Sequence, residues 1–449
     1  MNYRNQIMYF LGIGGIGMSA LARWFKQQGA HIYGYDLHSS PLTDELINEG
    51  MNIHFNADIG QLPENISIVV YTPAIPSDNI EIVHLKNLGI PIIKRAELIG
   101  KITKDYFTIA VAGTHGKTSI SALTAHLLKY VGINVTAFVG GICKNYNSNI
   151  IISNSTEYLV VEADEYDRSL LHIEPNIAVI SSMDEDHLDI YQDHEDIKTT
   201  FKKFAQKLPE TGVLIHNSKL ESFNNIRGTN ITYGINNDAS IFASNINVSS
   251  GKFVFDIDTK IGKIDNVEIQ VPGIHNIENT LASVAIAIEI GLSLKEIKTG
   301  ISTFKGVERR MDFRIVNENI IFIDDYAHHP EEIKATISAV KKLYPDKKIT
   351  GIFQPHLFSR TRDFAKMFAV ELNKLDELIL MEIYPAREKP IEGITSKTIL
   401  DKTNISGRVM GCDEILDYLS KNNPEVLLTM GAGDIGLLVK KIENQILIN

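Results

Sequence analysis

The sequence has few cysteines and no long apolar runs. Cys143 and Cys412 are the only two cysteines in 449 residues, and they stand far apart without paired spacing. This excludes a disulfide framework and a cysteine-rich zinc site, and it favours a reducing, cytoplasmic setting. Because no run of about 18 apolar residues is present, we expect no membrane-spanning helix and no membrane partner.

Positive charge is also scarce. Lys and Arg number 44 against 55 Asp and Glu, which gives a net charge of -11 at pH 7. A surface of this sign repels polyanions, so we expect no nucleic-acid partner, although a local basic cluster can still hold a phosphorylated small molecule. Hydrophobic residues at 44% and charged residues at 22% are typical of a globular protein, and the length predicts about three domains.

The apolar stretch at residues 7–17 follows Arg4 and imitates a signal peptide. Its glycines fall at fixed offsets, and Arg23 and Lys26 continue an amphipathic helix beyond them. We therefore expect this stretch to be part of the fold and not a signal peptide.

Apolar runs of strand length alternate with helical patterns along most of the chain, which is typical of parallel α/β folds. We expect strands at residues 7–11, 30–35, 67–71, 107–112, 158–161, 177–180, 319–323, 348–353, 377–380 and 425–429, and helices at 18–28, 78–88, 117–130 and 276–290. Residues 231–271 instead predict short antiparallel strands at a domain margin. The α/β pattern restarts twice, so the predicted domains span residues 1–105, 106–310 and 311–449.

Three glycines follow the first predicted strand in the pattern G-x-G-x-x-G. They are Gly12, Gly14 and Gly17, and Asp36 ends the next predicted strand nineteen residues later. Glycines at this spacing let backbone N–H groups approach a pyrophosphate at a helix N-terminus, and the acid can accept hydrogen bonds from a ribose. The pattern predicts a pyrophosphate-linked nucleotide and leaves open NAD, a nucleotide sugar or a tight turn without a ligand.

A second glycine-bearing loop joins the predicted strand at 107–112 to the predicted helix at 117–130. Its sequence, Gly-Thr-His-Gly-Lys-Thr at residues 113–118, is typical of a loop that surrounds nucleotide phosphates. In such loops the ammonium of Lys117 binds terminal phosphates, and the hydroxyl of Thr118 holds Mg²⁺. Val111 stands where the general pattern has its first glycine. The alternative is a glycine turn with an exposed lysine.

Acidic residues follow two further predicted strands. Glu162 comes directly after the strand at 158–161, at the edge from which a carboxylate can reach the metal of a nucleotide. It opens an acidic run that extends to Asp167, for which a solvated turn is the alternative. His187 lies among the acids of residues 184–189, after the strand at 177–180, which makes it a candidate metal ligand as well as a possible structural histidine.

The last third of the chain places cations and titratable groups near predicted strand ends. These residues are Arg309, Arg310, Asp325, His328, His356, Arg360 and Arg362. Because α/β domains bind ligands at such strand ends, the group predicts a ligand site. Asn276 and Asn279 open the helix at 276–290, where an asparagine can act simply as a cap.

The order of these motifs resembles that of the Mur ligase family, and the match spans essentially the whole chain. The segments that carry the resemblance are residues 12–18, 112–118, 162–165, 186–187, 275–279, 309–310, 325–330, 354–360 and 384–388. The resemblance implies an α/β fold with three domains: an N-terminal Rossmann-like domain for UDP, a central P-loop ATPase domain with an antiparallel margin, and a C-terminal Rossmann-like domain for the amino acid.

The resemblance also implies an activity. It is strongest to the members that join L-alanine to the lactyl carboxylate of UDP-N-acetylmuramate, with ATP as co-substrate and Mg²⁺ as cofactor, in peptidoglycan precursor synthesis. In this interpretation the first glycine loop binds UDP and not NAD. The carboxylate would take the γ-phosphoryl group of ATP and become an acyl phosphate, which the amine of alanine would then attack.

Family roles carry over to matching positions. For the UDP part these are Gly12, Gly14, Gly15, Ile16, Gly17 and Asp36. For ATP they are Gly113, Thr114, His115, Gly116, Lys117, Thr118, Ser119, Asn276, Asn279, Arg310 and Asp325. The implied Mg²⁺ ligands are Thr118, Glu162 and His187, and the implied catalytic group is Lys117, His187, His328, His356 and Arg360.

This sequence departs from the family at a few positions. Ser119 replaces a frequent Thr and keeps the hydroxyl, and Met311 stands where Phe is common. Several relatives carry a carbamylated lysine downstream of the Asp-His element, but Phe201 occupies that position here, so we expect no carbamylated lysine.

Three alternatives remain open. The first is a related ligase that recycles murein peptides by joining a whole peptide to the same UDP-sugar. The second is an NAD-dependent oxidoreductase, which would explain the first glycine loop and Asp36 but not the surroundings of Lys117. The third is a nucleotide-binding module without catalysis. The residues leave open the oligomeric state, regulation, the amino-acid preference and the group that takes the proton of the amine.

Overall fold

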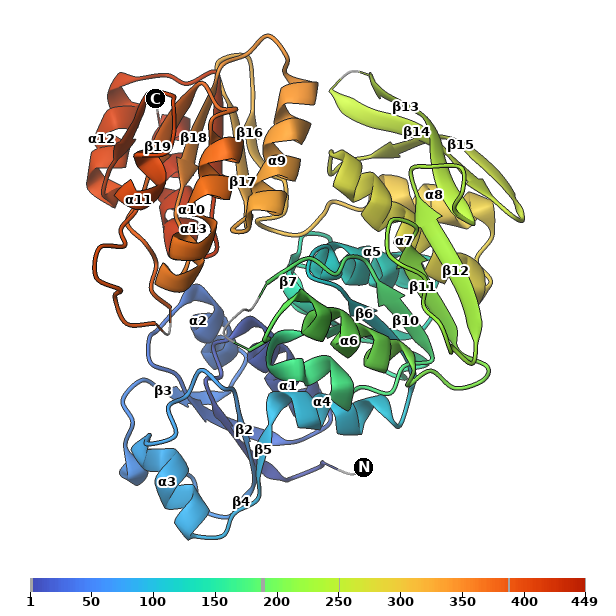
Figure 1. Ribbon diagram of the computed structural model, residues 1–449. Coiled ribbons are helices and arrows are strands. Elements are labelled where there is room, and N and C mark those ends of the chain that lie inside the picture. Colours follow the sequence, from blue (N-terminus) through green and yellow to red (C-terminus); the bar gives the residue numbers. More distant parts are fainter. Residues whose placement is uncertain (1–2, 187–189, 250, 387, 449) are drawn as a thin grey trace. The chain divides into compact units, whose positions relative to one another are not determined.

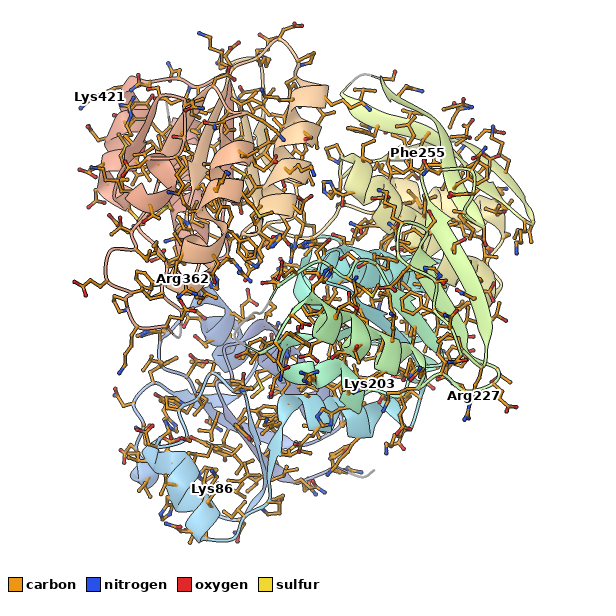
Figure 2. The ribbon with its side chains drawn as sticks, viewed as in Figure 1. Lys86, Lys203, Arg227, Phe255, Arg362 and Lys421 are labelled. Atoms are coloured by element: carbon orange, nitrogen blue, oxygen red, sulfur yellow. The ribbon has the colours of Figure 1, made fainter. Side chains whose placement is uncertain are left out.

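The computed structural model describes residues 3–186, 190–249, 251–386 and 388–448 (Figure 1). The chain forms two compact units. One consists of Met1–Ser244, Asp256–Asp265 and Glu278–Phe304, and the other of Asn245–Phe255, Asn266–Ile277 and Lys305–Asn449. Charged side chains such as Lys86, Lys203 and Arg227 are exposed, whereas Phe255 is buried (Figure 2).

The first sheet is parallel, with strand order β3-β2-β1-β4-β5. Its strands are β1 (Ile7–Leu11), β2 (His31–Tyr35), β3 (Asn52–His54), β4 (Ile66–Tyr71) and β5 (Ile92–Lys94), and its helices are α1 (Ile16–Gln27), α2 (Pro41–Asn48), α3 (Ile80–Asn87) and α4 (Arg95–Thr103). The strand order reverses between β1 and β4, and the loop that leads from β1 into α1 begins beside this reversal. Ligands of wound α/β sheets bind outside the carboxyl ends of the strands at such a point.

The second sheet has ten strands in the order β15-β14-β13-β12-β11-β10-β6-β9-β7-β8. Its strands are β6 (Phe107–Ala112), β7 (Val135–Cys143), β8 (Ser148–Ile151), β9 (Tyr158–Ala163), β10 (Ile177–Ile180), β11 (Val213–Asn217), β12 (Thr229–Gly234), β13 (Ile241–Ser249), β14 (Lys252–Thr259) and β15 (Gly262–Ile269). The helices of this region are α5 (Lys117–Tyr130), α6 (His194–Ala205), α7 (Ile274–Ile290) and α8 (Leu294–Thr303). Strand β10 is buried along its whole length, as expected for a parallel strand covered on both faces.

The third sheet has the order β16-β17-β21-β18-β19-β20, in which only the edge strand β16 runs antiparallel. Its strands are β16 (Asp312–Val316), β17 (Ile321–Asp325), β18 (Ile349–Phe353), β19 (Glu377–Leu380), β20 (Gly407–Val409) and β21 (Val426–Met430). Its helices are α9 (Pro330–Leu343), α10 (Phe358–Leu372), α11 (Lys397–Leu400), α12 (Cys412–Lys421) and α13 (Ile435–Ile448). Successive residues of β17 alternate between two apolar clusters, one shared with α9 and α10 and the other with α12 and α13, so helices cover both faces.

The α/β class expected from the sequence is confirmed, and each of the three expected domains contains one of the three sheets. The expected antiparallel margin differs in one respect, because Tyr233 and Gly234 of β12 pair with β13 in parallel. The hairpin of β7 and β8 was not expected, and the domain boundaries near 105 and 310 stay predictions. No helix of the described residues is long and apolar enough to cross a membrane.

A buried polar cluster fixes α3 against the first sheet. Glu81 is fully buried, and its carboxylate accepts hydrogen bonds from the Tyr9 hydroxyl at 2.5 Å and from the Asp58 backbone N–H at 2.8 Å. The Nε2 atom of His54 lies 2.9 Å from the same carboxylate. Removal of one member leaves the others unpaired inside the protein, which costs more than the loss of a surface contact.

We expect Glu81→Ala to lower the free energy of unfolding by about 3 kcal/mol, because it strands buried hydrogen-bonding groups. The fluorescence of Trp24, the only tryptophan, reports the urea transition of this region. The exposed Glu64→Ala is the matched control and should stay within about 0.5 kcal/mol of the parent. Equal transitions for Glu81→Ala and the parent would show that the cluster adds no stability.

Candidate functional site

The first glycine loop lies between β1 and α1. Gly12 has a φ of +85°, a conformation that side chains rarely adopt, and no side chain of the described residues caps the start of α1. Asp36 accepts hydrogen bonds from the backbone N–H groups of Gly14 at 2.7 Å and of Leu37 at 2.8 Å. The acid that the sequence assigned to a ribose therefore also holds the loop in place. The uncapped helix start offers N–H groups to an anion.

Arg95 lies against this loop and was missed by the sequence analysis. A Cβ atom built on Gly17 would meet the Arg95 guanidinium at 2.0 Å, so any other residue there would displace the guanidinium from this place. The guanidinium also lies 3.6 Å from the carboxylate of Asp164. The signal available in the sequence was the position of Arg95 directly after the short strand β5, but that strand was itself not predicted.

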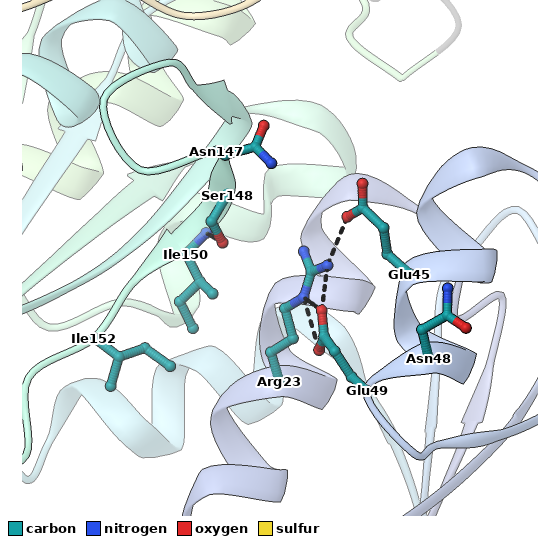
Figure 3. Close-up of a pocket in the computed structure, with 8 residues that line it drawn as sticks. All are labelled: Arg23, Glu45, Asn48, Glu49, Asn147, Ser148, Ile150 and Ile152. Atoms are coloured by element: carbon teal, nitrogen blue, oxygen red, sulfur yellow. Dashed lines mark hydrogen bonds and ion pairs between the residues drawn. The ribbon is translucent and has the colours of Figure 1, made fainter.

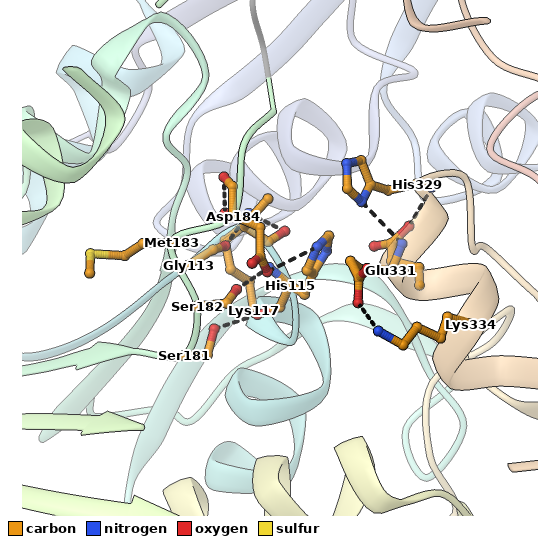
Figure 4. A network of polar contacts seen from close by, with 12 residues as sticks. Gly113, His115, Lys117, Ser181, Ser182, Met183, Asp184, His329, Glu331 and Lys334 are labelled. Carbon is orange, nitrogen blue, oxygen red and sulfur yellow. Dashed lines mark hydrogen bonds and ion pairs between the residues drawn. The ribbon is translucent and has the colours of Figure 1, made fainter. Parts of the chain in front are cut away.

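The second glycine loop, residues 113–118, lies between β6 and α5 and is held from the next strand end. The backbone N–H of His115 donates to the Ser182 hydroxyl at 2.8 Å, and the Ser181 hydroxyl donates to the His115 carbonyl (Figure 4). Gly113 has a φ of +132°, and a Cβ atom there would come within 2.1 Å of the Ser181 hydroxyl. Ser181 and Ser182 follow β10 directly, so the same strand-end reasoning that selected Glu162 could have selected them.

Lys117 is the first residue of α5, and its ammonium is enclosed by acceptors. It donates to both oxygens of Glu165, at 2.7 and 3.0 Å, and to the carbonyl of Gly113 at 2.6 Å. Burial by itself lowers the pKa of Lys117, but the carboxylates of Glu165 and Asp164 outweigh it and raise the pKa above that of an ordinary lysine. The lysine is therefore a fixed cation at the start of a helix.

The carboxylate of Glu162 lies beside the second loop, as the sequence predicts. The Thr118 hydroxyl donates to it at 3.2 Å, the Ser121 hydroxyl at 3.2 Å and the Gly140 backbone N–H at 2.5 Å. A carboxylate and a hydroxyl next to a phosphate loop fit Mg²⁺, which takes one or two protein oxygens and completes its shell with phosphate and water. No three acidic, His or Cys side chains of the described residues converge on one point.

The second metal ligand expected from the sequence, His187, lies outside the described residues. Of its neighbours, Asp184 lies 3.4 Å from the imidazole Nε2 of His115, and its carbonyl accepts a hydrogen bond from the Thr114 hydroxyl at 3.1 Å (Figure 4). These contacts connect the loop after β10 to the second glycine loop.

The segment after Glu165 is strained. Asp167 and Arg168 are consecutive non-glycine residues with φ angles of +52° and +53°. The Lys94 ammonium donates to the Asp167 carboxylate at 3.0 Å. The Arg168 guanidinium donates to the two carboxylate oxygens of Asp196 at 2.7 and 3.1 Å. Strain of this kind persists only where the surroundings enforce it, and it is common at functional sites.

The two asparagines expected at ATP lie at the start of α7. The side-chain oxygen of Asn279 lies over the second glycine loop, 2.5 Å from the place of a Cβ atom on Gly116. Asn276 is buried and donates to the carbonyl of Pro272 at 2.8 Å, which is the contact of a residue that fixes a helix start. Ser119 is partly exposed in the first turn of α5.

The second compact unit gathers its candidate residues at the carboxyl end of β17. Asp325 accepts backbone N–H bonds from Met311 and Ala327, both at 2.8 Å. Burial raises the pKa of Asp325 to about 6, against the opposing effect of the Arg310 guanidinium. That guanidinium lies 4.9 Å from the ring centre of Tyr326. The position supplies one carboxylate and one cation at a strand edge.

Three rings continue this edge toward β18. The His328 ring lies 5.8 Å from that of His356, which in turn stacks 5.8 Å from Tyr384. Arg360 is buried in the first turn of α10, and Glu388 caps this turn by accepting the Ser359 backbone N–H at 2.9 Å. The structure thus brings together His328 and His356 and places Arg360 on the helix that follows β18.

A third glycine-rich loop follows β21 and was missed by the sequence analysis. Gln354 accepts the Ile435 backbone N–H at 2.9 Å and donates to Asp434 at 2.5 Å. A Cβ atom on Gly433 would lie 2.5 Å from the Gln354 side-chain oxygen. The pattern Gly-Ala-Gly-Asp at residues 431–434, between a strand and a helix, was the available signal.

Comparisons with known proteins agree on one family. The models described as Mur ligase family catalytic domain, Mur ligase middle domain and Mur ligase glutamate ligase domain match residues 7–107, 111–287 and 309–433. The chain is 46% identical over 449 residues to a UDP-N-acetylmuramate–L-alanine ligase of Flavobacterium psychrophilum, with 98% of this chain and 99% of the relative covered. It is 44% identical to a protein of the same name from Porphyromonas gingivalis, with 96% and 97% covered.

Solved structures give the same result. A UDP-N-acetylmuramate–alanine ligase of Thermotoga maritima matches with a TM-score of 0.85 at 27% identity, and the match covers 98% of this chain and 99% of the other. A murein peptide ligase of Psychrobacter arcticus matches with a TM-score of 0.74 at 23% identity over 98% of both chains, which is a likeness of fold alone. The chain belongs to the Mur ligase family.

Proposed function

We propose that this protein joins L-alanine to the lactyl carboxylate of UDP-N-acetylmuramate while ATP becomes ADP and phosphate, a step of peptidoglycan precursor synthesis. The observation that carries the proposal is the 46% identity, over nearly the whole of both chains, to a relative named for this reaction. The fixed cation of Lys117 beside Glu162 and Thr118 supports it, because phosphoryl transfer depends on placed charge.

The reaction needs ATP because a carboxylate is a poor electrophile toward an amine. A carboxylate oxygen attacks the γ-phosphorus, the bond to the β-phosphate oxygen breaks, and an acyl phosphate and ADP form. The amine of alanine then attacks the carbonyl carbon, loses a proton, and phosphate leaves. Both steps develop negative charge on oxygen, which preorganised cations and N–H groups stabilise without reorganisation.

We assign the triphosphate to the second glycine loop, residues 113–118. Lys117 would bind its terminal phosphates in place of part of its present contact with Glu165, and Ser119, Asn279, Asn276, Arg310 and Asp325 would complete the ATP site. Thr118 and Glu162 would hold Mg²⁺, with His187 on a second ion, and the metal would neutralise charge on the phosphates. Gly12, Gly14, Gly15, Ile16, Gly17 and Asp36 would bind the UDP part, with Arg95 beside them.

We assign the incoming amino acid to the third sheet. His328 and His356 place two imidazoles together there, and Arg360 supplies a buried guanidinium on the helix that follows β18. The guanidinium is suited to the carboxylate of alanine, and an imidazole is suited to accept the proton of its amine. From the acidic net charge and the cysteine content we further infer a cytoplasmic protein without a nucleic-acid partner.

Phosphate release from ATP separates the candidate functions. With Mg²⁺ and UDP-N-acetylmuramate present, we expect L-alanine to stimulate release more than glycine, L-serine or a tripeptide. Stimulation by the tripeptide alone would favour the murein-recycling reaction. Hydride transfer to or from a nicotinamide cofactor without any use of ATP would contradict the proposal altogether.

We expect Lys117→Ala to lower kcat/KM for ATP about a hundredfold or more, because it removes a preorganised cation worth on the order of 3 kcal/mol at the transition state. Steady-state phosphate release measures this. The exposed Lys101→Ala on α4 removes the same charge elsewhere and should leave turnover unchanged. Full activity of Lys117→Ala would remove the basis of the ATP assignment.

We expect Gly113→Ala to abolish ATP binding while the protein stays folded. The new Cβ atom would clash with the Ser181 hydroxyl and with two backbone nitrogens within 3.0 Å. Calorimetric titration with ATP and far-UV circular dichroism measure the two properties. Gly132→Ala is the matched control. Its φ of +85° also strains an alanine, but no atom lies within 4 Å of the place of the new Cβ atom. Normal ATP affinity in Gly113→Ala would contradict the assignment.

A further inference from the structure

One buried amide connects the helix of the first glycine loop to the second sheet. Asn149 lies on β8 and is fully buried. Its amide nitrogen donates to the carbonyl of Ile16 at 2.6 Å and to the Ser19 hydroxyl at 2.8 Å, both in the first turn of α1. Its oxygen accepts a hydrogen bond from the Arg23 guanidinium at 2.6 Å. Both N–H groups and the oxygen of the amide are therefore engaged.

Arg23 fixes this contact from the other side. Its side chain is only 9% exposed, and its guanidinium reaches Glu45 at 2.9 Å and Glu49 at 2.6 Å (Figure 3). Glu45 is a residue of α2, and Glu49 ends that helix. Arg23 belongs to α1, so its guanidinium joins α1 to α2 and to the Asn149 side chain of the second sheet. A planar group with several donors holds such a geometry better than a flexible ammonium does.

The strand that carries Asn149 leads to the second glycine loop. Strand β8 pairs with β7, and β7 pairs with β9, the strand of Glu162. Gly140 on β7 donates its backbone N–H to the Glu162 carboxylate, which also receives the Thr118 hydroxyl. Two hydrogen-bonded strands therefore separate the contact at Ile16 from the carboxylate beside Lys117.

Apolar packing in the same interface leaves the register of α1 open. Trp24 of α1 contacts Phe138 of β7 with ring centres 6.2 Å apart. Apolar contacts of this kind are non-directional, so a helix can shift along a strand at little cost. Hydrogen bonds from one amide to the carbonyl of Ile16 and the hydroxyl of Ser19 are directional, and they are lost if the helix shifts by one residue.

We propose that Asn149 is a positioning residue that fixes the first glycine loop at one register relative to the second glycine loop. The inference rests on the proposed function, in which these loops hold the sugar nucleotide and ATP. The reacting carboxylate and the γ-phosphate must then meet within about 3.5 Å, and a misplacement of about 1 Å costs on the order of a hundredfold in rate. Because Asn149 is fully buried, it would act through Ile16 and Ser19.

Replacement of Asn149 by Leu tests the proposal, since Leu fills a similar volume without hydrogen bonds. We expect kcat for amide formation to fall at least tenfold, while the dissociation constants of ATP and of UDP-N-acetylmuramate, measured separately by calorimetry, stay within about threefold of the parent. Phosphate release without amide formation should rise relative to the coupled reaction. Ser148→Ala on the same hairpin is the matched control. The Ser148 hydroxyl accepts the Ile150 backbone N–H at 3.2 Å within its own strand, so this variant should behave as the parent.

Trp24 gives a readout that does not depend on activity. Because its ring packs on Phe138 across the same interface, a shifted α1 should change the emission of Trp24 in Asn149→Leu and leave it unchanged in Ser148→Ala. An unchanged emission together with unchanged kcat would overturn the proposal. So would a loss of kcat/KM that comes entirely from weaker binding of either nucleotide, since that is the result of simple damage to a binding loop.

A second variant covers the case in which Asn149→Leu does not fold. Ser19→Ala removes one of the two acceptors of the Asn149 amide and leaves the other, the carbonyl of Ile16, in place. It also removes the hydrogen bonds that the Ser19 hydroxyl donates to the carbonyls of Gly15 and Ile16. We expect a smaller fall in kcat, and in the double variant the two effects should not multiply, because they act through one contact. Parent-like kcat in Ser19→Ala, or independent effects, would overturn the proposal. A parent protein that makes no amide in the same assay would instead refute the proposed function.

Discussion

The ammonium of Lys117, on a side chain that is largely but not fully buried, is the constraint on which the central site depends. A cation removed from water needs compensating charge, and here both oxygens of Glu165 and the carbonyl of Gly113 supply it. This arrangement sets the shape of the second glycine loop before any nucleotide arrives. A triphosphate would also have to compete with the Glu165 carboxylate for the Lys117 ammonium. The affinity for the triphosphate would then reflect the difference in free energy between the Lys117–phosphate and the Lys117–Glu165 ion pairs.

The first and second glycine loops resemble one another in sequence pattern but differ in their electrostatics. The first loop is held by Asp36, which accepts backbone N–H groups, and the nearby cation is the Arg95 guanidinium against Gly17. The second loop contains its own cation at the first residue of α5. A loop of the first kind is suited to hold a group that does not react, whereas the second kind places a fixed charge where charge develops.

Much of the fold follows from local patterns in the sequence. Strands β1, β6, β10 and β19 and helix α5 have the residue ranges that apolar runs and glycine turns predict, because most of their residues are buried and the strands are largely apolar runs. Strands β3, β5, β8 and β20 span three or four residues each and carry too little pattern to be detected. The expected antiparallel margin was wrong for β12 and β13, since alternating residues do not reveal strand direction.

The candidate site was predictable where a motif joins a strand to a helix, and unpredictable where its parts meet only in space. Lys117, Thr118 and Glu162 meet as the strand-end rule requires. Arg95 and Gly17 are far apart in the chain, as are Asn149 and Ile16, and no local pattern links them. The contact of Arg95 with Gly17 arises because β5 ends close to the start of α1. The catalytic roles of His328, His356 and Arg360 rest on the resemblance to the Mur ligase family. The structure adds that the rings of His328 and His356 lie together.

Strand β8 is the last strand of its sheet, and α1 packs along it through Asn149. The same helix places Trp24 on Phe138 of β7, and both belong to one apolar cluster with Ile150 of β8. The central region expressed without the first hundred residues would expose this apolar face to water, and exposed patches of that kind promote aggregation. Attempts to isolate the central region for screening or crystallisation therefore need polar substitutions on this face or a replacement for α1.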